Sequence, residues 1–589
     1  MRFFGNVLAT IIGLFVFFMI IFFGLMIVGA IAGSGSDVAR VESNSVMVLD
    51  MENVSLDYTG KFTDPWVTIL NEEASVGLID VLNAVDNAKT DDKIKGISIL
   101  NSNSSLGLAQ SKALRNKLNE FKKSGKFIVS YADFFTQKEY YINSVADTIY
   151  MNPVGEMDFK GLSTEVMFFK EIQEKTGVKM EVIRHGKYKS AVEPFLENEM
   201  SEANREQISA LINSAWGSIV ADISLSRNIP VDSLNNIANQ LSARTPEMAL
   251  SKKLIDKIGY EDQYHNGIRK ALKVDKDEDY NSVSIMDYAK NVAKSPQKID
   301  SKDKIAIIYA QGEIMGGDGD VNVIGEGAMR TSLQEARKDE KVKAIVIRVD
   351  SPGGSALTSE LIWREIELTK KVKPVVVSMG NLAASGGYYI ACNANKIIAE
   401  PSTITGSIGV FGILPNMTEL SKKIGINTSE VKTHDHSAEY SPFRPIDEKF
   451  KEVTTESVEQ IYAIFVQRVA AGRKMTVEQV EAVAQGRVWT GSEAFKLGLV
   501  DQLGGLDLAL KEAATLAKIK KFKTQNYPEF DKSIMDFIND QNKLPFAKSK
   551  ETIIKEEIGI EAYETLKQVK KITAYKGIQM VMPFELKIK

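Results

Sequence analysis

DDKIKGISIL, residues 91–100, returns as DEKVKAIVIR at residues 339–348, an offset of 248 positions (339 minus 91). The same offset pairs the YYI at residues 140–142 with the YYI at residues 388–390, and no gap separates the two matches. Self-similarity at one fixed spacing is the signature of a repeated structural unit. The sequence therefore predicts two copies of one domain in tandem.

The copies and their borders divide the chain into four parts beyond its N-terminal region. We expect residues 44–272 to form the first copy and residues 304–519 to form the second. The polar residues 273–303 are typical of a linker between them. Residues 520–589 are rich in lysine and weakly patterned, and we expect them to form a C-terminal tail.

Each copy has the pattern of an α/β domain. Apolar β-branched runs at residues 344–349 and 375–378 flank a helical period at residues 359–371. This alternation indicates buried strands joined by helices. Long amphipathic helices are expected at residues 202–224 and 449–471, and a core-facing role explains both.

The composition is that of a folded protein and excludes several classes. Apolar residues make up 44% and charged residues 25% of the 589 residues, close to the averages of globular chains. The net charge of −4 gives no basic field for nucleic acid, so we expect no nucleic-acid partner. The single Cys392 and four histidines disfavour disulfides and metal sites, and we expect no cofactor.

The N-terminal region is predicted to cross a membrane. Residues 7–32 carry no charge and are rich in Ile, Phe, Leu and Val. As a helix they span about 39 Å, more than the roughly 30 Å of a hydrocarbon core. We expect one transmembrane anchor after a cytoplasmic stub of residues 1–6. A cleaved signal peptide is the alternative, because residues 30–32 resemble a cleavage site, but its apolar region has only about 7 to 15 residues.

The copies differ most where the second reads NLAASGGYY, residues 381–389, and the first reads DFFTQKEYY, residues 133–141. Ser385 thereby takes the place of Gln137. A serine between small residues and followed by two glycines can sit on a tight turn at the start of a helix, where backbone N–H groups can bind an oxyanion. The structural alternative is a turn with an N-capping serine.

A second glycine pair lies in DSPGGS, residues 350–355, where the first copy has SNSSLG, residues 102–107. A strand, a glycine pair and then a helix can aim backbone donors at a developing negative charge. A plain turn between strand and helix is the alternative. The Gly-Lys-Ser or Gly-Lys-Thr ending of a phosphate loop is absent from the sequence.

A serine nucleophile needs a base, and the histidines, such as His434, lie in polar or charged stretches. A neutral lysine can serve instead. Lys189 lies in YKSAVEPF, residues 188–195, among small and apolar neighbours, whereas the second copy has SAEYSPF, residues 437–443. On the residue pattern alone Lys189 remains one of many lysines, most of them solvated.

Three motifs give the chain a resemblance to the bacterial signal peptide peptidase A family, in its long, membrane-anchored, double-repeat form. They are ASGGYY at residues 384–389, YKSAVEPF at residues 188–195 and TGSIGV at residues 405–410. The resemblance implies a tandem repeat of two Clp-protease/crotonase-like α/β domains. It also implies a serine peptidase in which the second copy supplies Ser385 as nucleophile and the first supplies Lys189 as general base.

Further roles follow from the same resemblance. Ser407 would orient the lysine, and the backbone N–H groups of Gly354 and Gly386 would form the oxyanion hole. The implied substrates are remnant signal peptides and other short apolar peptides. The implied partners are the membrane and further copies of the chain in a tetramer-like ring. The implied location is the bacterial inner membrane, with a single span and the catalytic body facing the periplasm or exterior.

The implied peptidase mechanism requires a neutral lysine, and two other functions remain as alternatives. Lys189 must be neutral to accept a proton, so desolvation has to lower its pKa from the usual value of about 10.4. A catalytically silent membrane scaffold of the same fold would need no such change. A crotonase-like acyl-thioester enzyme would use the oxyanion hole without Lys189.

Overall fold

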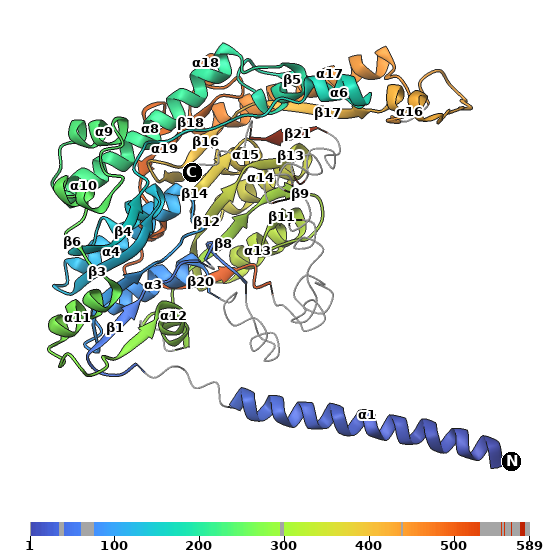
Figure 1. The fold of residues 1–589 in the computed structure, drawn as a ribbon. Helices are drawn as coiled ribbons and strands as arrows, with labels where there is room; N and C mark the ends of the chain where they lie inside the picture. Colours follow the sequence, from blue (N-terminus) through green and yellow to red (C-terminus); the bar gives the residue numbers. More distant parts are fainter. Residues whose placement is uncertain are drawn as a thin grey trace.

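The structure is a computed structural model that describes residues 2–34, 41–52, 54–60, 76–294, 300–437 and 440–530, together with residues 555, 559, 563, 567 and 578–582. Two α/β domains lie side by side, and an arm projects from them (Figure 1). The N-terminal helix α1 (Arg2–Ser34) lies apart from both domains.

The first domain is built on a six-stranded sheet in the order β6-β4-β3-β2-β1-β7, and all its strand pairs are parallel. Parallel neighbours need crossover connections, which helices such as α3 (Leu78–Ala88) and α4 (Leu108–Lys122) provide. The strands are β1 (Ser45–Val48), β2 (Ile94–Leu100), β3 (Phe127–Phe135), β4 (Thr148–Met157), β6 (Lys257–Ile258) and β7 (Ser282–Ser284).

The second domain repeats this plan with an eight-stranded sheet whose main path is β18-β16-β14-β12-β8-β20. The helices include α13 (Glu326–Lys338), α14 (Ala356–Lys370), α15 (Gly386–Ala391) and α20 (Leu506–Leu516). The strands are β8 (Lys304–Gln311), β12 (Val342–Ser351), β14 (Val375–Ala384), β15 (Lys396–Ala399), β16 (Ile404–Gly406), β18 (Val488–Thr490), β19 (Gln502–Leu503) and β20 (Lys523–Tyr527).

The strands and helices that the residue pattern predicts are present. The expected strands at residues 344–349 and 375–378 lie within β12 and β14, and the helix between them falls largely within α14. The two long helices are α8 (Glu202–Arg227) and α17 (Glu448–Arg473). A side chain caps the start of each, from Ser201 and Asp447.

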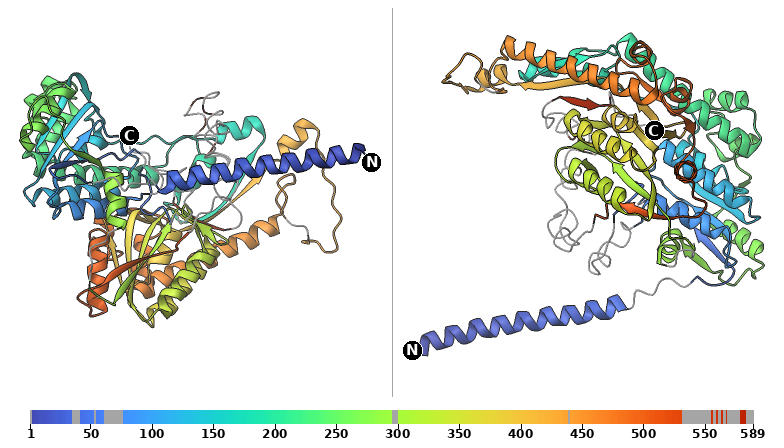
Figure 2. Two further views of the ribbon diagram at one scale, coloured as in Figure 1. Left: turned by 90° about the horizontal axis from the view of Figure 1, so that it is seen from below. Right: turned by 180° about the vertical axis from the view of Figure 1, so that it is seen from behind.

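Helix α8 is also long and apolar enough to cross a membrane. Its Ile219, Val220 and Ile223 are buried in the core of the first domain, so it is a core helix. In α1 the apolar side chains of residues 10–24 are all exposed, and the helix projects away from the domains (Figures 1 and 2). These side chains have no protein surface to cover them.

The structure corrects the predicted linker, residues 273–303. Within it, β7 pairs with β1, and the helix α12 (Ile285–Lys294) packs against α3. Val283, Ile285 and Tyr288 are buried in the core of the first domain. These apolar residues stand among many charged ones, and only their packing partners make them a strand and a helix.

The predicted tail, residues 520–589, is also corrected, because parts of it belong to the sheets. Strand β20 pairs in parallel with β8 at the edge of the second domain. Strand β21 (Gln579–Val581) lies in a third sheet. Most of the segment between these two strands lies outside the described residues.

The third sheet joins the two copies. Its order is β10-β11-β9-β13-β21-β17-β5, and it includes β5 (Lys179–His185) from the first copy. The other strands are β9 (Glu313–Met315), β10 (Gly319–Asp320), β11 (Val323–Gly325), β13 (Gly353–Ser355) and β17 (Val410–Asn416). Strands β5 and β17 pair antiparallel along their whole length and form the core of the arm.

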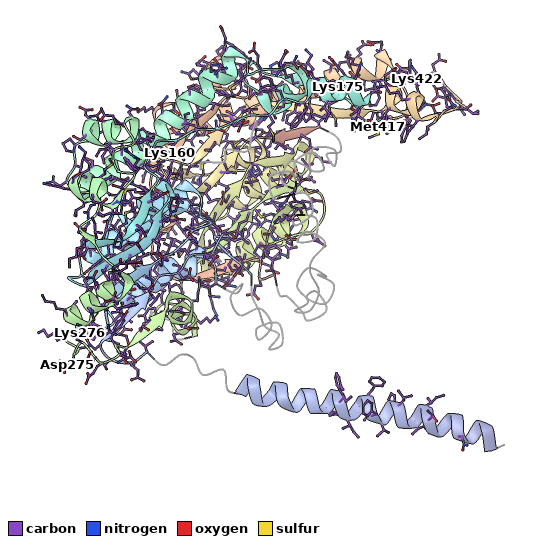
Figure 3. All side chains as sticks on the ribbon, in the orientation of Figure 1. Lys160, Lys175, Asp275, Lys276, Met417 and Lys422 are labelled. Atoms are coloured by element: carbon purple, nitrogen blue, oxygen red, sulfur yellow. The ribbon has the colours of Figure 1, made fainter. Side chains whose placement is uncertain are left out.

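Equivalent short helices of the two copies meet at the end of the arm, α6 (Lys170–Thr176) and α16 (Thr418–Ile424). The ammonium group of Lys423 donates a hydrogen bond to the carbonyl oxygen of Lys175 at 3.0 Å. Figure 3 labels Lys175 there, beside Met417 and Lys422. The arm is therefore made by both copies.

A buried ion pair also ties the domains together. The guanidinium of Arg348, on β12, lies 2.6 Å from the carboxylate of Asp57 in the first copy. It also donates to the hydroxyl of Ser378 and to the carbonyl of Met379, at 2.9 and 2.8 Å. Both charged side chains are almost fully buried, so each relies on the other for compensation.

Replacing Arg348 with Met should therefore destabilise the protein strongly. The buried carboxylate of Asp57 would lose its partner, which costs about 3–5 kcal/mol in comparable buried pairs. The midpoint of urea unfolding measures the change. Glu419→Gln, which breaks an exposed ion pair with Lys422, is the control and should leave the midpoint nearly unchanged. Equal midpoints for Arg348→Met and wild type would contradict a structural role for the pair.

Candidate active site

Ser385 stands at the junction of β14 and α15 in a rare backbone conformation, with φ of 56° and ψ of −115°. The backbone is held by hydrogen bonds on both sides, from Ser385 N–H to Gly406 O and from Tyr389 N–H to Ser385 O, each 2.8 Å long. Its hydroxyl makes no cap hydrogen bond, so the alternative of an N-capping serine is wrong. Non-glycine residues held with positive φ cluster at functional sites.

The structure brings Lys189 of the first copy to Ser385 of the second. The amine Nζ of Lys189 lies 2.9 Å from the hydroxyl Oγ of Ser385. The same Nζ lies 3.0 Å from the hydroxyl of Ser407 and 3.3 Å from its carbonyl oxygen. All three residues are fully buried. The three side chains predicted to act together are therefore in direct contact within one chain.

Two glycines make room for the lysine. A Cβ on Gly486 would lie 2.7 Å from the Cβ of Lys189, and one on Gly409 would lie 3.2 Å from its Cδ. Gly486 also has a φ of +80°, which favours glycine. The ring of Phe411 lies with its centre 5.8 Å from Nζ. The stem of Lys189 is thus packed in a tight, largely apolar channel.

This packing changes the acidity of Lys189. Burial lowers the pKa of its amine well below the usual value, because the charged form loses its water shell. Lys189 has no salt bridge to a carboxylate within the described part of the chain, and its hydrogen-bond partners are two serines. The site thus favours the neutral amine, the form that can accept a proton.

Ser407 is placed by the loop between β16 and β17. Its backbone N–H donates to the carbonyl of Arg487 at 2.7 Å, and its φ is 51°. The side chain is thereby fixed beside Lys189. Arg487 in turn pairs with Glu206 on α8, 2.8 Å away, so the loop is anchored to the first copy.

The two glycine loops touch each other beside Ser385. A Cβ on Gly353 would lie 2.7 Å from the backbone nitrogen of Gly386. One on Gly386 would lie 3.2 Å from the backbone nitrogen of Gly354. The two loops can approach this closely only because glycine has no side chain. Their contact brings the backbone nitrogens of Gly354 and Gly386 close together next to Ser385. This is the arrangement that an oxyanion hole needs.

The equivalent place in the first copy is filled by an amide. The side chain of Gln137 accepts hydrogen bonds from the backbone N–H of Lys160 and Gly161, at 3.1 and 2.7 Å, and donates to the carbonyl of Gly161 at 2.9 Å. Gln137 therefore closes its own loop and holds no nucleophile. The first copy contributes a lysine but no serine of its own to such a pair.

Sequence reasoning missed a buried carboxylate that links the two glycine loops. Asp350 accepts a hydrogen bond from the backbone N–H of Leu382 at 2.8 Å and one from the amide of Asn381 at 3.3 Å. Burial raises its pKa to about 7, and the nearby carboxylate of Asp57 adds to the rise. Asp350 is the first residue of the DSPGGS motif. Only the packing reveals that its carboxylate accepts these hydrogen bonds from the second glycine loop.

The family model for peptidase family S49 matches residues 120–275 and 367–520, which is more than half of the chain. The chain belongs to peptidase family S49. One match covers the later part of each copy, so the tandem repeat is confirmed. An S49 peptidase of this kind is a serine peptidase, and its two domains have the expected α/β fold.

This S49 peptidase has relatives of similar length. Protease 4 of Salmonella typhi is 36% identical over 79% of this chain and 75% of its own. Protease 4 of Haemophilus influenzae is 34% identical over 84% of this chain and 83% of its own. Serine protease SPPA of Arabidopsis thaliana chloroplasts is 35% identical over 73% and 64%, respectively. The resemblance to the signal peptide peptidase A family is thereby confirmed.

A solved structure with some likeness is that of a mutant ClpP1 from Listeria monocytogenes. It covers 35% of this S49 peptidase and 94% of its own chain, at 15% sequence identity and a TM-score of 0.24.

Replacing Lys189 with Met tests the lowered pKa through stability. The unfolded lysine binds a proton below about pH 10.4, whereas the folded one does so only at lower pH, so the unfolded state binds more protons between the two values. Wild-type stability should therefore rise with pH in this window, by about 1.4 kcal/mol per pH unit relative to Lys189→Met. Urea unfolding of both proteins between roughly pH 7 and 9 measures it. Parallel curves would contradict the lowered pKa.

Proposed function

We propose that this S49 peptidase is a membrane-anchored endopeptidase that hydrolyses short apolar peptides, including remnant signal peptides, with Ser385 as nucleophile and Lys189 as general base. The observation that carries the proposal is the distance of 2.9 Å between Nζ of Lys189 and Oγ of Ser385, at a lysine whose burial favours the neutral amine. A neutral amine beside a hydroxyl is the pair that a serine-lysine mechanism needs.

The first half of the reaction forms an acyl-enzyme. The lone pair of Lys189 takes the hydroxyl proton while Oγ of Ser385 attacks the substrate carbonyl carbon. The carbonyl oxygen becomes an oxyanion, which the backbone N–H groups of Gly354 and Gly386 stabilise. The tetrahedral intermediate then expels the amine of the scissile bond, which receives from the Lys189 ammonium the proton that came from Ser385.

The second half releases the product. A water molecule gives a proton to the neutral Lys189 and attacks the ester carbon, and collapse of the second intermediate returns that proton to Oγ of Ser385. The products are a free carboxylic acid and a restored enzyme. Ser407 positions the lysine throughout, because its hydroxyl and carbonyl oxygens can accept the two N–H bonds of the neutral amine. That leaves the lone pair for Ser385.

The same geometry favours a peptidase over the two other functions. An acyl-thioester enzyme would need the oxyanion donors but not a desolvated lysine in contact with a serine hydroxyl. A silent scaffold would need neither. Burying an unpaired lysine costs stability, and a catalytic role for the neutral amine accounts for that cost.

The exposed apolar helix α1 supports anchoring in the bacterial inner membrane. We propose that the catalytic body faces the periplasm or exterior. Exposed apolar side chains on the arm, at Ile172 and Ile424, support contacts with further copies of the chain in a tetramer-like ring. The peptide, the membrane and other copies are then the partners of the enzyme.

Ser385→Ala should lower kcat for peptide hydrolysis about a thousandfold or more, because the nucleophile is lost. A fluorophosphonate probe should label wild type at Ser385 and leave the variant unlabelled. Gln137→Ala, at the matching position of the first copy, is the control and should keep wild-type kcat and labelling. Hydrolysis by Ser385→Ala above roughly one-tenth of the wild-type rate would refute the proposal.

Activity should rise with pH, because only the neutral form of Lys189 is a base. The measurement is kcat/KM between roughly pH 6 and 9, where a rising limb should appear. Lys189→Arg should be inactive throughout this range, since a guanidinium stays charged. Lys187→Arg, two residues away and exposed, should keep the wild-type profile. An active Lys189→Arg would show that another group is the base.

A further inference from the structure

Two equivalent helices of the copies are capped in different ways at their first turns. Helix α14 of the second copy follows Ser355, whose hydroxyl accepts a hydrogen bond from the backbone N–H of Thr358 at 3.3 Å. The repeat offset of 248 (355 minus 107) pairs Ser355 with Gly107, which precedes α4 of the first copy and has no side chain. The first backbone N–H groups of a helix need acceptors from outside it. Helix α4 must therefore receive its cap from another part of the chain.

Asn381 of the second copy supplies this cap across the domain boundary. Its side-chain oxygen accepts a hydrogen bond from the backbone N–H of Gln110 at 3.1 Å. Gln110 is the third residue of α4, as Thr358 is of α14. A Cβ on Gly107 would overlap the amide group of Asn381, so the glycine makes room for the capping side chain. A side chain of one copy thus caps a helix of the other.

The nitrogen of the same amide contacts the DSPGGS loop of its own copy. It donates a hydrogen bond to the carboxylate of Asp350 at 3.3 Å. The carboxylate also accepts the backbone N–H of Leu382 at 2.8 Å. Asn381 therefore connects α4 of the first copy with the buried carboxylate of the second.

Asp350 lies at an irregularity of the sheet that leads directly to Ser385. Between two paired positions, β12 advances from residue 349 to residue 351, while β14 advances from residue 379 to residue 383. The extra backbone of β14 cannot pair with β12 in the regular way, and the carboxylate of Asp350 accepts its N–H at Leu382. Gly380 makes room for this carboxylate, because a Cβ there would lie 2.9 Å from the Cγ of Asp350.

The network holds both loops of the proposed oxyanion hole. Asp350 belongs to the loop of Gly354, and its bond to Leu382 holds the loop of Gly386. Asn381 ties both loops to α4, in the copy that supplies the proposed base. A misplacement of about 1 Å can cost a hundredfold in rate, because oxyanion donors must meet the transition state at hydrogen-bond distance.

The first copy has a different pair of residues at these positions. The offset of 248 places Ser102 where the second copy has Asp350, and Asp133 where it has Asn381. Asp133 is exposed, and its carboxylate accepts hydrogen bonds from side chains of its own copy. The pair of Asp350 and Asn381 is therefore present only in the copy that carries the proposed nucleophile.

We infer that Asn381 and Asp350 are positioning residues, which hold the turn of Ser385 and the two oxyanion loops against the first copy. The inference rests on the proposed function and adds side chains that act on the transition state through the backbone. Docking of the two domains is then coupled to catalysis through one amide. A substitution at the start of α4 should alter the rate without touching the reacting atoms.

Gly107→Ala tests this coupling from the first copy. The backbone of Gly107, with φ of −75° and ψ of 175°, suits alanine, so the new methyl group acts by displacing Asn381. We expect kcat on an internally quenched apolar peptide to fall at least about tenfold, with KM within about twofold of wild type. The rate is expressed per site that the fluorophosphonate probe labels at completion. Gly217→Ala, where a Cβ meets nothing within 4 Å, is the control and should keep the wild-type kcat.

Two variants of the second copy test the same network. Asn381→Ala removes the bridging amide, and Asp350→Asn keeps the shape of the carboxylate with one oxygen acceptor fewer. Both should lower kcat at least about tenfold and leave KM within about twofold. Asp133→Ala, at the position of the first copy that matches Asn381, is the control and should keep the wild-type kcat.

A double variant shows whether Gly107→Ala acts through Asn381. Gly107→Ala combined with Asn381→Ala should have the kcat of Asn381→Ala alone, because the methyl group then has no amide to displace. Losses that multiply in the double variant would overturn the inference. If Gly107→Ala does not fold, Asn381→Ala and Asp350→Asn decide the matter.

A peptide aldehyde separates positioning from a general structural defect. Ser385 adds reversibly to the aldehyde carbon, and the oxygen of the adduct lies where the oxyanion of the reaction would lie. The inhibition constant should therefore rise in parallel with the loss of kcat/KM. A structural defect would reduce the number of labelled sites and leave the inhibition constant unchanged, and that result would overturn the inference.

The remaining outcomes distinguish this inference from the proposed function. Wild-type kcat in both Asn381→Ala and Asp350→Asn, with hydrolysis still dependent on Ser385, contradicts the positioning role alone. Hydrolysis that survives Ser385→Ala contradicts the proposed function, whatever the other variants do.

Discussion

Contact between a desolvated lysine and a serine is the constraint on which the rest of the site depends. Burial lowers the pKa of the Lys189 amine only while water is kept from it, and neither copy can exclude water alone. The first copy supplies the lysine on the stretch that follows β5, and the second supplies the glycines and the phenyl ring that enclose it. The mixed sheet of β5 and β17 and the ion pair of Asp57 with Arg348 hold these surfaces together.

The two copies of the domain carry different residues at equivalent positions. The second keeps the strained turn of Ser385, whereas the first has replaced it with Gln137, whose amide satisfies the neighbouring backbone. A backbone whose hydrogen-bonding groups are paired in this way needs no strained conformation, and the Gln137 side chain is not a nucleophile. One chain therefore carries one complete proposed site, built across the boundary of its domains, and the first copy acts as the support for the second.

Much of this arrangement is visible in the sequence, and the misses have a common physical cause. The repeat offset predicts the two domains. The glycines that follow Ser385 predict its tight turn, because a turn depends on local backbone geometry. Lys189 could be chosen among many lysines only through its motif, since burial depends on the partner domain. The strands β7 and β21 are short, and a sheet edge elsewhere in the chain decides their structure.

The order of these elements along the chain has a consequence for biosynthesis. Ser385 follows Lys189 by 196 residues, and Gly486 and Arg487, which complete the enclosure of the site, come later still. Ribosomes add roughly 5–20 residues per second, so a chain under translation spends many seconds with Lys189 made and Ser385 not yet joined. During that time the growing polypeptide contains no assembled site. A peptidase whose parts are separated in this way cannot attack other nascent proteins before its own translation is nearly finished.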